Sequence, residues 1–209
     1  ITFFFVVRKI QPSTAMTDSE RKITAIYQAG KAAARHILQT TQEVVKITIN
    51  PVIKEIQTTN VGLVIDSKAE KTSENDKLID HKKEQRLKLG EVFTKSNTSH
   101  QELLSNAEQE KECMALLAGS AALQLLLNDS YAQCNKHDRA EAMHIIYSMI
   151  SNGEKVDDKL KAQAIAIKDQ YEKQIFELLK QHQDLLEKIV AELIQNTTID
   201  RYTWKSLIN

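Results

Sequence analysis

The chain has 209 residues, of which 42% are hydrophobic and 27% charged, as in ordinary soluble proteins. Its 28 basic and 28 acidic side chains give zero net charge, which argues against nucleic acid as the main partner, because phosphate binding needs concentrated positive charge. Only 5 glycines and 2 prolines occur, and this scarcity favours long helices over a turn-rich fold.

The first 16 residues differ in composition from the rest of the chain. The apolar block ITFFFVV is followed by Arg8 and Lys9. It is too short to span a bilayer, which takes about 20 apolar residues. Three interpretations stay open: the end of a targeting peptide, a frayed tail, or translated sequence upstream of an initiator at Met16. We therefore expect residues 1–16 to form a disordered or targeting-like N-terminal tail.

A long helix is expected after this tail, because Thr17 and Glu20 stand at the spacing of a capping box. Apolar side chains then recur every three or four residues, as on one helix face. Pro51 would kink this helix. The many β-branched residues between Val44 and Ile56 also suit a strand, but the spacing and the lack of an evident partner strand favour a helix.

The middle of the chain begins with a polar segment and ends with the longest apolar run. Residues 66–76 lack apolar anchors and are expected to be a flexible connection. Helix is expected to resume near Lys77 and to lead into the run CMALLAGSAALQLLL at residues 113–127. Fifteen helical residues span only about 22 Å, which is short for a bilayer crossing.

This apolar run carries two stripes on different sides of the expected helix. One stripe is formed by Met114, Leu117, Ala118, Ala121 and Leu125, and the other by Leu116, Leu123 and Leu127. A helix that is apolar all round must be covered all round. The second stripe is therefore explained by burial in the chain's own centre, by a dimer or partner interface, or by membrane insertion. We predict a homodimer that contacts its partner through Leu116, Leu123 and Leu127.

The last helix is expected to begin at an N-cap, Asp138, and to run to about Asn196 with a break at Asn152-Gly153. Apolar side chains along it alternate in steps of four and three, as in a coiled coil. Residues 198–209, which carry Trp204, are expected to be a C-terminal tail that folds back or is disordered. The fold class that follows is all-α: an elongated three-helix antiparallel bundle over residues 17–197, with long kinked helices.

The residue types that carry catalysis form no recognisable constellation. The six histidines are scattered, and there is no HExxH, CxxC, glycine-rich phosphate loop or GxSxG element. Cys134 lies near His137, but a thiol and an imidazole without an orienting third group are weak evidence for catalysis. We predict no catalytic, cofactor-binding or metal-binding residues, and a protein that is not an enzyme.

Three short stretches resemble the Smac/Diablo family of mitochondrial pro-apoptotic proteins. They are QTT at residues 39–41, SHQELL at residues 99–104 and the small-residue apolar run after Met114. The resemblance implies an elongated dimeric helical protein of the mitochondrial intermembrane space, released to the cytosol to block inhibitor-of-apoptosis proteins. The family's N-terminal tetrapeptide would fall on Ala15, Met16, Thr17 and Asp18, which lack its proline and its bulky apolar fourth residue.

Three functions are consistent with this sequence. The first is a non-enzymatic helical interaction protein, either a Smac-like antagonist of inhibitor-of-apoptosis proteins or a coiled-coil scaffold subunit of a cytoplasmic assembly. The second is a membrane-inserting, pore-forming helical protein that uses residues 113–127, although membrane binding is not the favoured expectation. The third, an enzyme, has the least support.

Overall fold

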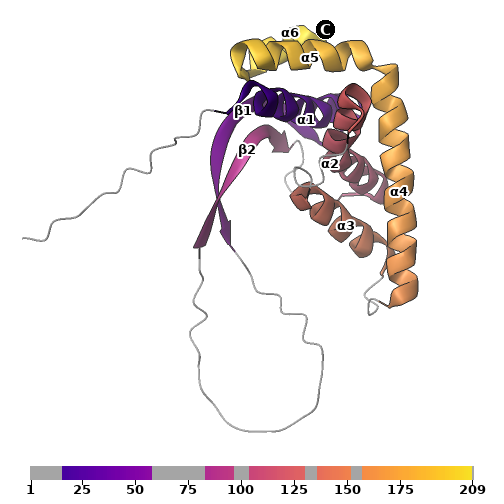
Figure 1. The fold of residues 1–209 in the computed structure, drawn as a ribbon. Helices are drawn as coiled ribbons and strands as arrows, with labels where there is room; N and C mark the ends of the chain where they lie inside the picture. Colours follow the sequence, from indigo (N-terminus) through magenta and orange to yellow (C-terminus); the bar gives the residue numbers. More distant parts are fainter. Residues whose placement is uncertain (1–15, 58–82, 97–103, 130–135, 152–156, 209) are drawn as a thin grey trace, which may run out of the picture.

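The computed structural model describes residues 16–57, 83–96, 104–129, 136–151 and 157–208. Within them it shows six helices and three strands (Figure 1). In chain order these are α1 (Asp18–Ile37), β1 (Gln42–Gln57), β2 (Lys83–Ser96), α2 (Asn106–Leu127), α3 (Lys136–Ile150), α4 (Asp158–Gln181), α5 (Gln183–Asn196), β3 (Thr198–Ile199) and α6 (Arg201–Ile208).

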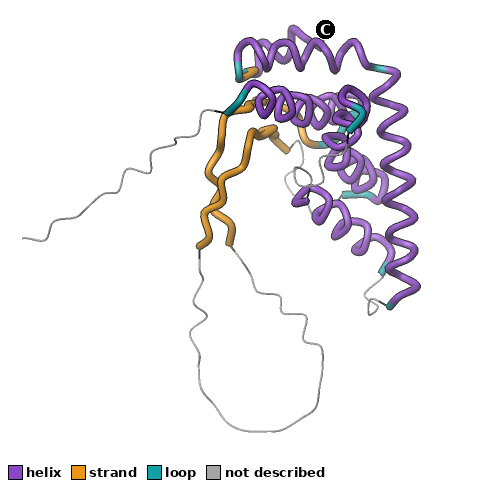
Figure 2. Tube along the Cα trace, in the orientation of Figure 1, coloured by secondary structure: helices purple, strands orange, loops and turns teal. Residues whose placement is uncertain are grey.

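The expected all-α, three-helix antiparallel bundle is wrong, because the structure combines helices with an antiparallel sheet of strand order β2-β1-β3 (Figure 2). The single long helix expected after Thr17 is two elements, α1 and β1. Valine, isoleucine and threonine crowd β1, and such β-branched side chains suit a pleated strand better than a helix. The expected coiled coil is wrong for the same reason as the bundle.

The β1–β2 pair extends away from the helices as a long two-stranded ribbon (Figure 1). Its register shifts between Thr48 and Pro51, so the proline sits at an irregularity, where a missing N–H is tolerated. Gly90 has φ +71°, and a methyl group there would lie 2.7 Å from the carbonyl oxygen of Thr48. Only glycine fits this close, left-handed position.

Helix α1 begins as the sequence predicts. The Thr17 side chain accepts a hydrogen bond from the Glu20 backbone N–H, and the Glu20 carboxylate accepts one from the Thr17 backbone N–H. From Thr24 to Ala34 every residue of the helix is buried. The helix has this burial because it lies between the sheet and α2.

Helix α2 is the centre of the fold and contacts α1, α3 and α4. Its two stripes are both covered by the same chain, since Leu117 is 2% exposed and Leu123 1% exposed. Small residues let α1 approach closely. A methyl group on Gly30 would lie 2.5 Å from the Cβ of Ala122, and one on Gly119 would lie 2.5 Å from the Tyr27 ring. This contact therefore has room for nothing larger than glycine.

The expected last helix is three helices, α3, α4 and α5. Helix α3 begins at Lys136, so Asp138 lies in its first turn and is not its N-cap. A second break falls at His182, between α4 and α5. The expected C-terminal tail is folded over residues 198–208: β3 pairs with β1, and Trp204 on α6 is 3% exposed.

Candidate functional site

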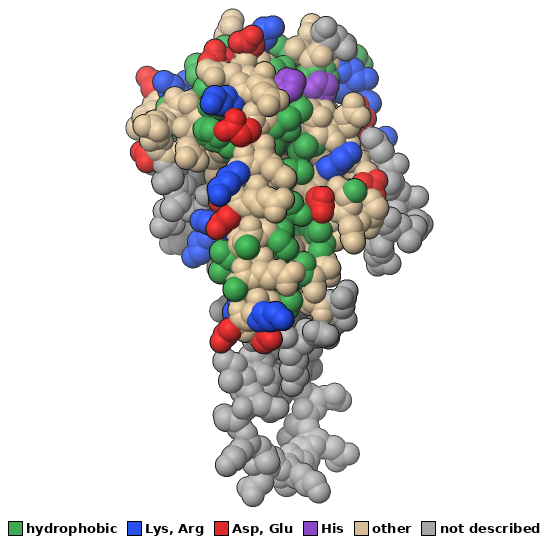
Figure 3. Space-filling model, turned by 90° about the vertical axis from the view of Figure 1, so that its right-hand side faces the viewer, with side chains coloured by type: hydrophobic (Ala, Val, Ile, Leu, Met, Phe, Trp, Pro, Cys, Tyr) green, Lys and Arg blue, Asp and Glu red, His purple; other side chains and the backbone are tan. Residues whose placement is uncertain are grey.

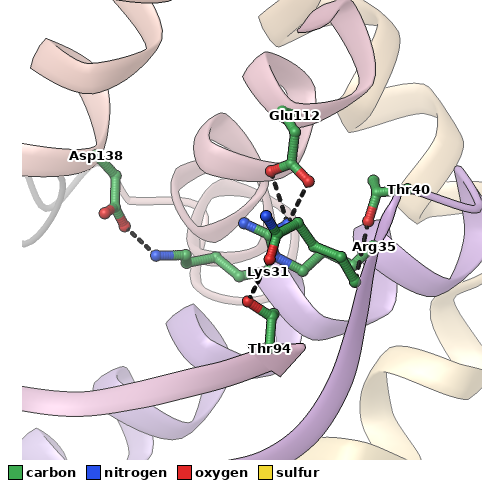
Figure 4. A network of polar contacts seen from close by, with 7 residues as sticks. Lys31, Arg35, Thr40, Thr94, Glu112 and Asp138 are labelled. Carbon is green, nitrogen blue, oxygen red and sulfur yellow. Dashed lines mark hydrogen bonds and ion pairs between the residues drawn. The ribbon is translucent and has the colours of Figure 1, made fainter. Parts of the chain in front are cut away.

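Three polar side chains project from one face of α1 into the centre of the molecule. Tyr27, Lys31 and Arg35 are spaced four residues apart, which places them above one another on a helix. Lys31 and Arg35 meet acidic groups from α3 and α2 (Figure 4). A row of polar groups on the most buried helix of a chain requires partners, because an unpaired buried charge is costly.

The first of these sites joins α1 to α3 through Asp138. The Lys31 Nζ lies 2.5 Å from Asp138 Oδ2, and the side chains are 6% and 5% exposed. The Tyr27 hydroxyl donates a hydrogen bond of 2.6 Å to the same oxygen. The Lys31 ammonium also lies 5.8 Å from the centre of the Tyr27 ring. The three groups form what we name the central cluster.

The second site is one helical turn further along α1. The Arg35 Nη1 donates to both carboxylate oxygens of Glu112 on α2, each at 2.7 Å, and the side chains are 10% and 13% exposed. The Arg35 Nε is buried without a hydrogen-bond partner. This pair and the central cluster tie α1 to two other helices by charge-assisted bonds, which are the stronger kind.

The residue types of the central cluster are not those of a metal site. Of Tyr27, Lys31 and Asp138 only the aspartate is a good zinc ligand, and the cation beside it is the Lys31 ammonium. The cluster as it stands is suited to holding helices together.

The other side of α1 is bound to the sheet. Gln28 is 1% exposed, and its Nε2 donates to the Leu89 carbonyl oxygen of β2 at 3.2 Å, while its Oε1 is buried without a hydrogen-bond partner. This amide therefore fixes β2 against α1, and it lies next to the close contact at Gly90.

A cavity of about 270 Å³ lies at the C-terminal end of α1, against β1 and α6. Its lining includes Arg35, His36, Glu43, Trp204 and Lys205. Ligand cavities in proteins are usually about 300–1,000 Å³, so this one is suited at most to a small molecule.

The buried groups that could react are held in unreactive forms. Burial, assisted by the negative charge of Glu110, raises the pKa of Cys113 to about 12, and its Sγ donates to the Ala142 carbonyl oxygen. Burial, assisted again by Glu110, raises the pKa of Tyr171 to about 12. Both therefore stay protonated at neutral pH, and a thiol is a far weaker nucleophile than a thiolate.

The residues predicted for an interface are mostly inside the chain. Leu116 is 6% exposed and Leu123 1% exposed, and only Leu127 is half-buried. The explanation by burial in the chain's own centre therefore accounts for this stripe, and the basis for a dimer through it is gone. Whether the chain dimerises stays a prediction.

Of the four residues matched to an N-terminal binding motif, three lie in the described part of the chain. Ala15 lies outside the described residues. Two other features singled out in the sequence, Cys134 and the polar segment at residues 66–76, also lie outside them. Met16 is half-buried, Thr17 caps α1, and Asp18 is exposed in its first turn.

Sequence reasoning missed the central cluster. The available signal was Lys31 itself, which stands between Gly30 and three alanines in an otherwise apolar, small-residue stretch. A lysine among residues that pack closely is one that needs a partner. The identity of that partner could not be foreseen, since Asp138 lies 107 residues away in the chain.

No protein-family model matches this chain, and no curated protein matches it either. Among the described residues no three His, Cys, Asp or Glu side chains are placed to hold a metal ion together. Of the helices in those same ranges, none has the length and apolarity to cross a membrane. The residues and their geometry are therefore the basis for assigning a function.

Proposed function

We propose that this chain is a non-enzymatic protein-interaction domain whose buried ionisable groups stabilise the fold. The central cluster carries this proposal. A catalytic lysine must be reachable and must lose its proton, whereas the Lys31 ammonium is buried and bound to the Asp138 carboxylate. The cluster neutralises itself within the chain, which is what a structural role requires.

The surface that we assign to a partner is on α3, beside its buried face. Only Asp138, Ala142 and Ile146 of this helix are fully buried, while Met143, Ile145, Tyr147, Met149 and Ile150 are half-buried, and all of these five except Met149 also pack against the core. Methionine and tyrosine are enriched in protein interfaces, where they supply adaptable apolar contact. Because each of these side chains keeps part of its surface exposed, the partner that suits them is the apolar face of an amphipathic helix.

The rest of the described surface shows neither a concentrated charge nor a second apolar patch. On the α4 side, positive and negative side chains are interspersed between hydrophobic ones (Figure 3). The large hydrophobic side chains that are most exposed, Leu89, Ile165, Ile194 and Tyr202, lie on four different elements. Scattered apolar residues of this kind are normal on a soluble surface and mark no patch.

The narrower functions have less support. A Smac-like antagonist was expected to be an all-α bundle, and the sheet removes that part of the likeness. Membrane insertion by residues 113–127 would have to extract α2 from the centre of the fold, where Leu117 and Leu123 are almost fully buried. A scaffold role within a larger assembly is compatible with the proposed domain and is included in it.

The experiment starts with a photo-crosslinking amino acid in place of Met149 to identify the partner in the native cell. The purified pair is then titrated by calorimetry. Met149→Glu should weaken binding at least about tenfold, since it puts a charge in an apolar contact. Ser148→Glu is the matched control, because it adds the same charge at the exposed neighbouring residue, and it should bind as the unaltered chain does.

The role of the central cluster is tested in the same assay. An apolar triple variant, Tyr27→Phe with Lys31→Met and Asp138→Leu, removes the charges and nearly keeps the size of the first two side chains. Such replacements of a whole buried ion pair are often tolerated. If the triple variant folds by circular dichroism and binds the partner normally, the cluster is structural. A folded triple variant that loses function would overturn the proposal.

A further inference from the structure

His36 stands where three parts of the chain meet. It lies in the last turn of α1, and its ring meets the Trp204 ring of α6 edge-on, with centroids 6.1 Å apart and an interplanar angle of 88°. Edge-to-face contacts of this kind contribute about 0.5–1.5 kcal/mol. Because Trp204 is 3% exposed, this contact is part of what seats α6 against the end of α1.

A second imidazole, His182, comes from the break between α4 and α5. The break is sharp, with φ −114° and ψ 30° at His182, whose backbone N–H donates to Leu179 and whose side chain does not cap α5. A positive charge on His182 opposes protonation of His36 and so helps to lower the pKa of His36, after the larger effect of burial. A junction of two rigid helices at a single residue is a place where their angle can change.

The charged groups around His36 come from every element that meets there. Arg35 precedes it on α1, Glu43 comes from β1, Lys205 from α6 and His182 from the helix break. Arg35 is held by Glu112, and Glu43 is held by Arg201 at 3.0 Å. Among the described residues that line the cavity with His36, Glu43 is the only carboxylate, and it is already engaged, so a proton on His36 would add to the positive charge of Arg35 and Lys205 around this cavity.

We propose that His36 and Trp204 form an acid-sensitive latch, which holds α6 on the end of α1 at neutral pH and releases it when the His36 imidazole gains a proton. Release would open the cavity that Arg35, Glu43 and Lys205 line, because α6 forms one of its walls. The latch belongs to the rim of the molecule and is independent of the partner surface assigned to α3.

The direction of the effect follows from proton linkage. Burial, and secondly the charge of His182, lower the pKa of His36 below its ordinary value in the docked state. A released His36 would regain an ordinary pKa of about 6.5 and bind the proton more readily. Docking is therefore unaffected above about pH 6.5 and weakens as pH falls from there through the lowered pKa.

The experiment uses Trp204, the only tryptophan in the chain, as an internal probe of docking. Its quenching by acrylamide measures how far the indole is reached by solvent. We expect the quenching constant to rise at least about threefold between about pH 7.5 and about pH 5, with far-UV circular dichroism unchanged. A constant that stays the same, or one that rises only together with loss of helix, would overturn the latch.

Three variants identify the groups responsible. His36→Gln should keep the indole protected at both pH values. His182→Gln should move the midpoint to higher pH, since it removes a charge that opposes protonation of His36. His144→Gln, an exposed position on α3, is the matched control and should behave as the unaltered chain. If both of the first two variants showed the same transition as the unaltered chain, the proposal would be refuted. If His36→Gln proved poorly folded, an unchanged midpoint in His182→Gln would still refute it.

Discussion

The centre of the molecule and its rim use the same kinds of charged residue in different surroundings. At the centre, Lys31 and Asp138 are 6% and 5% exposed, and at the rim Arg201 and Glu43 are 48% and 33% exposed. The distances are alike, 2.5 and 3.0 Å. Water solvates the rim pair whether or not it forms, whereas each central charge depends on its partner. Burial therefore decides how much the loss of one partner from each pair would change the stability of the fold.

The largest effect expected at the centre is chemical. Because the pKa of Cys113 is about 12, almost none of this thiol is ionised at pH 8. In a Cys134→Ser background, we expect Cys113 to react with a thiol reagent about a thousandfold more slowly in the native protein than in denaturant. The rate at which the absorbance of the reagent changes measures the reaction rate of Cys113. Rapid native reaction would show that the α2–α3 contact opens readily.

Asp138→Ala is expected to give the largest loss of stability. It leaves the Lys31 ammonium buried without its carboxylate, and breaking a buried pair in this way costs about 3–5 kcal/mol. Urea unfolding followed by circular dichroism gives the free energy of unfolding. The apolar triple variant should recover most of the loss. If Asp138→Ala were nearly neutral, water would have to reach Lys31.

Gly30→Ala is expected to come next. The added methyl would lie 2.7 Å from the Ala118 carbonyl oxygen, so α1 and α2 must move apart, at a cost of about 1–3 kcal/mol. The change in the urea midpoint measures this loss of stability. The control is Ala162→Val on the exposed side of α4, which should change stability by less than about 1 kcal/mol. Equal effects at both sites would mean that the helices are not closely packed.

Arg201→Gln at the rim should have the smallest effect, less than about 1 kcal/mol, because exposed ion pairs are weak. A double-mutant cycle with Glu43→Gln isolates the interaction, and its coupling energy should fall further as salt is added. A salt-independent coupling above about 2 kcal/mol would place the rim pair in the same class as the central one.

Local signals in the sequence predicted local structure well. The capping box at Thr17 and Glu20 is present, and the apolar run at residues 113–127 lies in a helix. Of the explanations offered for the two stripes of that run, burial inside the same chain fits the described contacts of Leu116 and Leu123. These features depend on residues within a few turns of one another, which is what periodicity and capping report.

The strands could not be predicted with the same means. Apolar residues between Val44 and Val52 fit both helical and extended spacing, and the decision for a helix rested on the lack of a partner strand. The partner, β2, begins at Lys83, after a connection of a length that hairpins rarely have. The pairing of Lys31 with Asp138 could not be predicted either, because the two residues are far apart in the chain and no local pattern specifies their contact.

The smallest strand sets the order in which the sheet can be completed. Thr48 of β1 meets Thr198 of β3 across 150 residues of chain, and the backbone N–H of Ile49 donates to the Thr197 carbonyl oxygen. During synthesis at about 5–20 residues per second, β1 therefore waits many seconds for the strand that covers its second edge. Until then that edge is free to pair with another chain, so the nascent protein is expected to depend on chaperones or on rapid release.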